Sequence, residues 1–264
     1  MATYGGRRAN PVLVARSHWA AALASALGDR GAREFLAACP DLVVEVPCDG
    51  TGDPRDVDRL EDLGHDVRRI DVDLMDADDA GADAAYVLAA DVARAVRRAR
   101  EARRLPLVLS GNCNSALGTV AGLGAASTGV VWCDAHGDFN TPETSASGFL
   151  DGMSLATLVG RCCAQDAARI PGFAAVPEDA VVLVGARARD EPERALREAS
   201  DVRMVSAGPA PGESLAAAIE SWPDGIASAY LHVDLDVLDA AEATVNEYAA
   251  EGGLSLPDLL GCID

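Results

Sequence analysis

Residues 131–140 have the sequence VWCDAHGDFN. The stretch begins inside an apolar run at 129–133 and continues into Asp134, His136 and Asp138, whose side chains can bind metal. The run has the length and composition of a buried strand. Alternate residues of an extended segment point to one side, so Asp134, His136 and Asp138 converge where the strand emerges. Carboxylate oxygen and neutral imidazole nitrogen are ligands that suit Mn, Fe or Zn. The stretch predicts a metal site at a strand end, with a loop of solvated acids as the alternative.

A second motif, YLHVDLDVLD at residues 230–239, repeats this arrangement about a hundred residues later. Asp234 and Asp236 stand two apart at the end of an apolar run, and such paired carboxylates repel each other unless a cation neutralises them. Carboxylates from two strand ends could bridge two divalent ions, which generate hydroxide and orient a substrate. His232 shares the parity of these two residues, and we expect a core or supporting histidine there rather than a ligand.

The two motifs resemble those of the ureohydrolase superfamily, which includes arginase, agmatinase and formiminoglutamase. The superfamily pattern is Asp-Ala-His-x-Asp-x-Asn, followed by Asp-x-Asp-x-x-Asp-Pro, and the similarity runs over about residues 107–256. The resemblance implies an α/β protein with the three-layer α/β/α arginase-like fold and a mainly parallel sheet. It further implies one metallohydrolase domain over residues 1–264 and Mn²⁺ as the cofactor, in two sites of which one is weak.

The resemblance also implies roles for individual residues. The expected metal ligands are Asn114, Asp134, His136, Asp138, Asp234 and Asp236. Asn114 is matched to the histidine of the superfamily's Gly-Gly-Asp-His-Ser motif, whose aspartate is matched to Cys113, so the sixth ligand is a weak one. Asp138 and His136 are expected in catalysis. Asp151 stands where arginases usually have a proton-transferring histidine, although it could equally be an N-cap for a helix over 152–159.

Three polar residues are expected to bind the substrate. Asn140 and Ser147 match the arginase loop that holds a substrate α-carboxylate, and both are neutral donors suited to that group. The arginase pattern Gly-x-Arg-Asp places an aspartate near the substrate α-amino group, but this chain has Ala188 there and Asp190 two residues later. We therefore expect recognition of the α-amino group to differ from that in arginase.

These observations predict Mn²⁺-dependent hydrolysis of a guanidino or amidino C–N bond by a metal-bound hydroxide. The substrate would be arginine or a derivative such as Nω-hydroxyarginine, and the product urea or a substituted urea. The alternative is a non-catalytic or truncated homologue that acts as a binding or oligomerisation subunit, because the chain ends at Asp264, before a glutamate that contacts the guanidinium in the family. The cost of burying unpaired carboxylates favours the enzyme.

Composition restricts the partners. The net charge is −20 and all 22 basic residues are arginine, which argues against nucleic acid and anionic membranes. No apolar run approaches the roughly 20 residues of a membrane span. The seven cysteines are odd in number and lack zinc spacing, so free thiols in a cytoplasmic protein are expected. The predicted partners are a small guanidino or amidino substrate and further copies of the chain in a homo-oligomer.

The rest of the chain alternates between strand-like and helix-like segments, as a mainly parallel sheet requires. Short apolar runs predict strands at 42–46, 106–109, 129–133, 180–185, 202–205 and 230–233. Helical periodicity or composition predicts helices at 82–104, 191–199 and 213–221.

Overall fold

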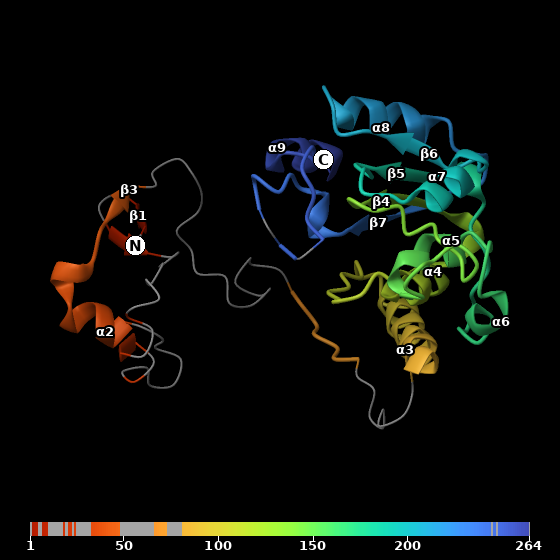
Figure 1. Ribbon diagram of the computed structural model, residues 1–264. Helices are drawn as coiled ribbons and strands as arrows, with labels where there is room; N and C mark the ends of the chain where they lie inside the picture. Colours follow the sequence, from red (N-terminus) through yellow and green to blue (C-terminus); the bar gives the residue numbers. More distant parts are fainter. Residues whose placement is uncertain are drawn as a thin grey trace. The chain divides into compact units, whose positions relative to one another are not determined.

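The computed structural model describes residues 2–4, 7–9, 18, 21–22, 24, 33–47, 66–72, 81–243, 245–246 and 248–263 (Figure 1). The chain divides into two compact units, Met1–Arg69 and Ile70–Asp264. None of the helices in these described segments is long and apolar enough to cross a membrane. A single domain over 1–264 stays a prediction.

The first unit contains a small sheet with the strand order β2-β1-β3. Its elements are β1 (Ala2–Tyr4), β2 (Arg7–Ala9), α2 (Arg33–Ala38), η3 (Pro40–Leu42) and β3 (Val46–Pro47). The predicted strand at 42–46 is wrong, since only its last residue lies in β3. A 3-10 turn starts at Pro40, and the Val43 N–H still donates to the Pro40 carbonyl, so the chain turns where extended backbone was expected.

The second unit is built on a four-stranded parallel sheet with the order β6-β5-β4-β7. Its strands are β4 (Thr128–Cys133), β5 (Val181–Val184), β6 (Arg203–Val205) and β7 (Ser228–Val233), which confirms four predicted strands. The predicted strand at 106–109 is wrong. Leu107 and Leu109 are exposed, and the segment pairs with none of the strands in the described residues.

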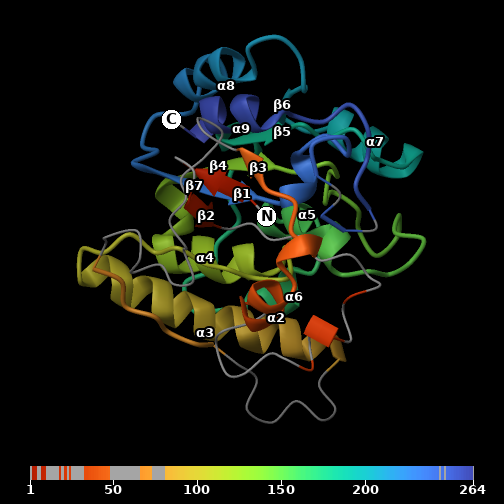
Figure 2. The ribbon, with the colours of Figure 1, turned by 90° about the vertical axis from the view of Figure 1, so that its left-hand side faces the viewer.

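Helices cover both faces of this sheet (Figures 1 and 2). The core on one face includes side chains of α3 (Gly81–Glu101), α4 (Ser115–Leu123), α5 (Ser154–Leu158), α6 (Ala164–Ala167) and α7 (Glu191–Glu198). The core on the other face includes side chains of α8 (Pro211–Glu220) and α9 (Leu256–Ile263). Short 3-10 turns complete the unit: η5 (Ala125–Ser127), η6 (Asp151–Met153), η7 (Glu178–Ala180) and η8 (Leu235–Val237). This arrangement confirms the α/β prediction of a three-layer α/β/α fold with a parallel sheet.

The alternation of β4 side chains produces the two cores. Val130 and Trp132 enter the core on the α3 and α4 side, whereas Val131 and Cys133 enter the core under α8 and α9. All four are almost fully buried. The strand is therefore fixed on both faces, which holds the residues that follow it in a defined place.

Candidate metal centre

The sheet brings the two predicted motifs together through the pairing of β4 with β7. Cys133 is the register partner of Val233, so the chain leaves both strands at the same level. The Asp234 N–H donates to the Cys133 carbonyl at 2.9 Å, which continues the pairing by one residue. Asp134 and Asp234 thus begin adjacent loops at the carboxyl edge of the sheet, where sites in parallel sheets usually lie.

Three predicted ligands converge in those loops. Nδ1 of His136 lies 3.2 Å from Oδ1 of Asp134 and 3.3 Å from Oδ2 of Asp236. Both carboxylates are almost fully buried, at 1% and 2% exposure. The hydrogen bond to Asp134 has the largest effect on the pKa of His136, followed by that to Asp236. Together they raise this pKa to about 10, although burial acts to lower it. One ligand atom from each residue lies within 4.8 Å of the others, so the group has the spacing of a cation site.

Asp138 is held in a strained conformation beside this group. Its φ is 48°, in the left-handed region that non-glycine residues seldom occupy. Its side chain is buried, and Oδ2 finds no hydrogen-bond partner in the described part of the chain. Burial, followed by the charge of Asp134, raises the pKa of Asp138 well above its usual range. A buried, unpartnered carboxylate oxygen fits a site that accepts a cation or a proton.

Glu193, which sequence reasoning missed, supports the loop that carries Asp138. It is 4% exposed, and Oε1 accepts the Phe139 N–H at 2.8 Å. A Cβ at Gly137 would lie 2.7 Å from the same oxygen, so the loop needs glycine there. Burial raises the pKa of Glu193. The signal available in the sequence was a glutamate in the first turn of α7, three residues after Asp190.

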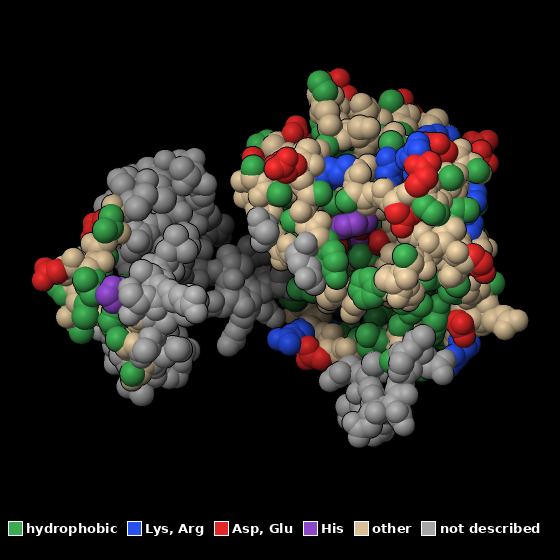
Figure 3. Space-filling model, viewed as in Figure 1, with side chains coloured by type: hydrophobic (Ala, Val, Ile, Leu, Met, Phe, Trp, Pro, Cys, Tyr) green, Lys and Arg blue, Asp and Glu red, His purple; other side chains and the backbone are tan. Residues whose placement is uncertain are grey.

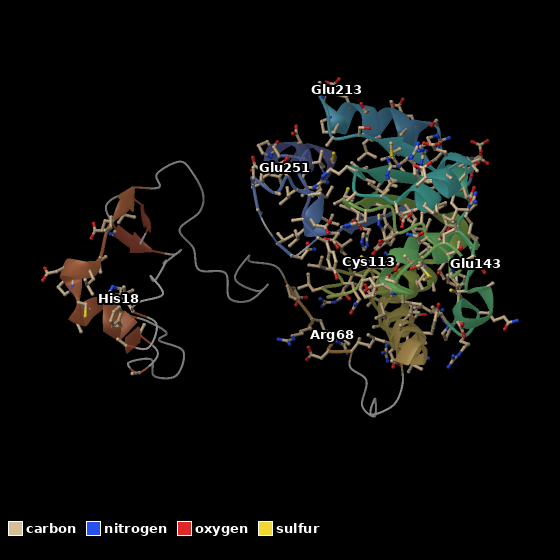
Figure 4. All side chains as sticks on the ribbon, viewed as in Figure 1. His18, Arg68, Cys113, Glu143, Glu213 and Glu251 are labelled. Carbon is tan, nitrogen blue, oxygen red and sulfur yellow. The ribbon has the colours of Figure 1, made fainter. Side chains whose placement is uncertain are left out.

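The turn before α4 presents Cys113 rather than Asn114 to the aspartates. The Cys113 thiol donates to Oδ2 of Asp234 at 3.8 Å, and it lies with Asp134 and His232 in a second group of ligand atoms within 4.8 Å. Figure 4 labels Cys113 at this turn. Burial, followed by the charge of Asp138, raises the pKa of the thiol. The Asn114 side-chain amide instead donates to Asp151, so its predicted ligand role gains no support from this geometry.

His232 is a core residue, as the sequence suggested. Its ring stacks on Trp132 with 3.7 Å between centroids, and Nδ1 lies 3.1 Å from the Tyr230 hydroxyl. Burial lowers its pKa to about 4, so the imidazole is neutral at physiological pH. Nε2 is buried and has no hydrogen-bond partner among the residues described. The same stack orients Trp132, whose indole N–H donates to Oδ2 of Asp134 at 3.2 Å.

Asp151 faces the turn before α4. Its carboxylate accepts from the Asn112 amide at 2.6 Å and from the Asn114 backbone N–H at 3.3 Å. The alternative role as a helix N-cap is wrong, because Asp151 is the first residue of η6 and the N-cap of α5 is Met153. Two asparagines therefore hold the residue that was expected to transfer protons.

Two of the three predicted substrate residues meet. The Asn140 amide donates to Oδ2 of Asp190 at 3.4 Å, and Oδ1 of Asp190 caps α7 by accepting the Glu193 N–H at 2.9 Å. Ser147 is exposed, and its hydroxyl accepts the Phe149 N–H at 3.1 Å. Asn140 and Asp190 thus form a polar pair, while Ser147 stands in a local turn.

The centre opens to the surface at His136. Figure 3 shows a histidine in a hollow on one face of the second unit. The His136 side chain is 31% exposed, whereas His232 is 8% exposed as a residue, so His136 is the one a ligand can reach. Buried carboxylates surround one accessible imidazole, an arrangement that attracts cations.

The sequence and structure are similar to those of arginases. The model of the Arginase family matches residues 51–264. The arginase of Bacillus subtilis is 32% identical over 212 residues, which cover 75% of this chain and 71% of that protein. The N(omega)-hydroxy-L-arginine amidinohydrolase of Streptomyces lavendulae is 37% identical over 125 residues, which cover 47% of this chain and 42% of that protein.

Solved structures agree with this similarity. The arginase of Bacillus caldovelox has a TM-score of 0.63 and 30% identity, covering 76% of this chain and 73% of that one. The arginase of Bacillus cereus has a TM-score of 0.59 and 32% identity, covering 67% of this chain but only 63% of that one. The family match spans most of the chain and includes both motifs of the centre. The chain therefore belongs to the Arginase family.

Proposed function

We propose that this chain hydrolyses a guanidino C–N bond at a centre that holds Mn²⁺. The observation that carries the proposal is the convergence of His136, Asp134 and Asp236 beside the unpartnered carboxylate oxygen of Asp138. Burying so many carboxylates around one imidazole is costly unless a cation compensates them. The donor set therefore fits a divalent ion.

Two groups of side chains would hold the metal. His136, Asp134 and Asp236 would form one group, and Cys113 with Asp234 would form the other, with Asp134 close to both. We propose Cys113 as a ligand, since its sulfur faces the aspartates while the Asn114 amide is taken by Asp151. Bound Mn²⁺ would lower the pKa of water and polarise the guanidino group.

The chain's own residues would bind and orient the substrate and move protons. Asp138 has a raised pKa, which suits it to accept a proton from the attacking water and release it to the leaving amine. Asn140 and Asp190 would bind the amino acid end of the substrate, with Ser147 at the mouth. In the overall reaction, water adds to the guanidino carbon and a C–N bond breaks. The products are an amine and urea or a substituted urea.

The names of the relatives support two substrates. The arginases point to arginine, and the amidinohydrolase of Streptomyces lavendulae points to Nω-hydroxyarginine. We propose Nω-hydroxyarginine as the second candidate because Asn114 and Asp151 stand where arginases were expected to have histidines, and Cys113 stands where they were expected to have an aspartate. The homo-oligomer and the cytoplasmic location stay predictions.

Metal content and turnover test this proposal together. The purified protein is loaded with Mn²⁺, dialysed and analysed for bound metal beside an Asp134→Ala variant, then assayed with arginine and Nω-hydroxyarginine. Stoichiometric metal that the variant loses, with release of urea or hydroxyurea, supports the hydrolase. Metal without turnover favours the alternative of a non-catalytic homologue. No bound metal overturns the proposed centre.

A further inference from the structure

The segment that follows η8 returns to the centre and contacts the metal-ligand candidate Asp236. Nδ2 of Asn246 donates to Oδ2 of Asp236 at 3.0 Å, and this oxygen also lies 3.3 Å from Nδ1 of His136. The other carboxylate oxygen accepts the Ala135 N–H at 3.1 Å. Asn246 thus contacts the oxygen that faces the imidazole, the one best placed for a cation.

The orientation of the Asn246 amide is set by a second hydrogen bond. Its Oδ1 accepts the Tyr248 backbone N–H at 2.9 Å, so Nδ2 is the group left to face Asp236. The Tyr248 ring meets His136 edge-on, with 6.2 Å between centroids and an angle of 85°. Asn246 and Tyr248 therefore contact the two members of the same ligand pair from one segment.

The base of this segment is closed by Arg187. Its guanidinium donates to the carbonyls of Asp236 and Leu238 where the segment begins, each at 3.0 Å. It also donates to the carbonyls of Ala250 at 2.7 Å and Glu251 at 3.1 Å where the segment returns. Figure 4 labels Glu251 at this return. One fixed, planar side chain thus joins both ends of the segment.

Asp239 reinforces the same closure. Its carboxylate accepts the N–H groups of Ala241 at 2.8 Å, Gly252 at 2.6 Å and Gly253 at 2.9 Å. A Cβ at Gly253 would lie 2.5 Å from the Asp239 nitrogen and 2.7 Å from Nη2 of Arg187, so the returning chain needs glycine to approach so closely. The segment is held at its base, and its placement beside Asp236 is built into the fold.

We infer that Asn246 is a positioning residue for Asp236, and that Arg187 and Asp239 hold the segment that carries it in place. A hydrogen-bonded partner fixes the orientation of a ligating carboxylate, and removal of such a partner typically weakens metal binding by roughly 10- to 100-fold. The inference rests on the proposed function, since Asp236 needs orienting only if it binds a cation. Asn246 itself is assigned no contact with metal or substrate.

Mn²⁺ affinity of the full chain tests this inference without recourse to turnover. Asn246→Ala and Asn246→Leu are titrated with Mn²⁺ by calorimetry, and the bound ions are followed by electron paramagnetic resonance. Both variants should bind one equivalent of Mn²⁺ roughly 10-fold or more weakly. Leucine has the same number of side-chain heavy atoms as asparagine in the same branched arrangement, so a packing role would leave Asn246→Leu close to the wild type.

A matched control lies in the same segment. Glu242 is exposed and lies between Asp236 and Asn246 in the sequence. Glu242→Gln removes its charge and leaves the hydrogen bond between Asn246 and Asp236 in place. It should bind Mn²⁺ as the wild type does, and thermal melts of the metal-free proteins check that all variants fold. Unchanged Mn²⁺ affinity in both Asn246 variants would overturn the inference alone. A wild-type chain that binds no Mn²⁺ would overturn the proposed function and this inference together.

Discussion

The thiol of Cys113 lies 3.8 Å from Oδ2 of Asp234, although 121 residues separate them along the chain. The contact joins the turn before α4 to the loop after β7. It places a soft sulfur donor among hard carboxylate oxygens, and thiolate ligands shift metal preference towards ions such as Zn²⁺. This contact distinguishes the centre from one built only of carboxylates and imidazole.

The first prediction concerns this thiol. Protein loaded with Co²⁺ should show a thiolate-to-metal charge-transfer absorption, and Cys113→Ser should lack it because a hydroxyl gives no such band. Cys262→Ser is the matched control, since Cys262 packs on the opposite face of the sheet. Persistence of the band in Cys113→Ser would show that its sulfur is not a ligand.

The second prediction concerns the loop of Asp138. Glu193→Ala removes the acceptor for the Phe139 N–H and leaves that donor unsatisfied in a buried site. The free energy of unfolding should fall by about 2 kcal/mol. Glu193→Gln keeps an acceptor oxygen and should lose less, as measured by urea unfolding of the metal-free proteins. Equal losses in the two variants would contradict the hydrogen-bond explanation.

The third prediction concerns Arg187. Arg187→Ala removes the donor shared by the carbonyls at both ends of the segment after η8, and should reduce the free energy of unfolding by about 3 kcal/mol. Arg187→Lys should recover only part of the loss, because one ammonium cannot reach all of those carbonyls. Arg194→Ala is the control, since the ion pairs of Arg194 within the described part of the chain are with exposed glutamates of its own helix. An equally small effect at both arginines would contradict the role of Arg187.

The fourth prediction concerns pH. Arg161 pairs with Glu178. Its hydrogen bond is the main reason why the pKa of the Glu178 carboxyl is lowered in the folded chain. The pair therefore stabilises the fold above the ordinary glutamate pKa, and the effect is lost as pH falls through the lowered one.

Glu178→Gln tests this pH dependence by urea unfolding. It should cost about 1 kcal/mol at pH 7 and almost nothing at the acid end of the range in which the fold persists. A cost that does not change with pH would mean that packing rather than charge explains the effect.

The local sequence pattern was sufficient to predict a strand where the segment is buried on both faces of the sheet. The apolar runs at β4 and β5 predicted buried strands because both faces of each are covered. The run at 106–109 looks the same in sequence, yet a strand also needs a hydrogen-bonding neighbour, and the sequence of one segment does not contain that information. Leu109 is accordingly 78% exposed.

The candidate site could be predicted from the sequence where the spacing of residues at the end of one strand determines which way their side chains point. Asp134 and His136 alternate after β4, and the structure brings them together with Asp236. The choice between Cys113 and Asn114 depends on how the turn enters α4, which adjacent residues alone do not reveal. Asn246 acts through the carboxylate of Asp236, and Arg187 acts through backbone carbonyls far away in the chain, so no local motif marked them.

The register pairing of Cys133 with Val233 has a consequence for the way the protein is made. Ala135 and Asp236 touch across 101 residues, so half of the centre does not yet exist when the first motif leaves the ribosome. A nascent chain can gather its ligands only after β7 has been synthesised and has docked beside β4. Ion capture would then be one of the last events of biogenesis, and would mark chains whose sheet has closed correctly.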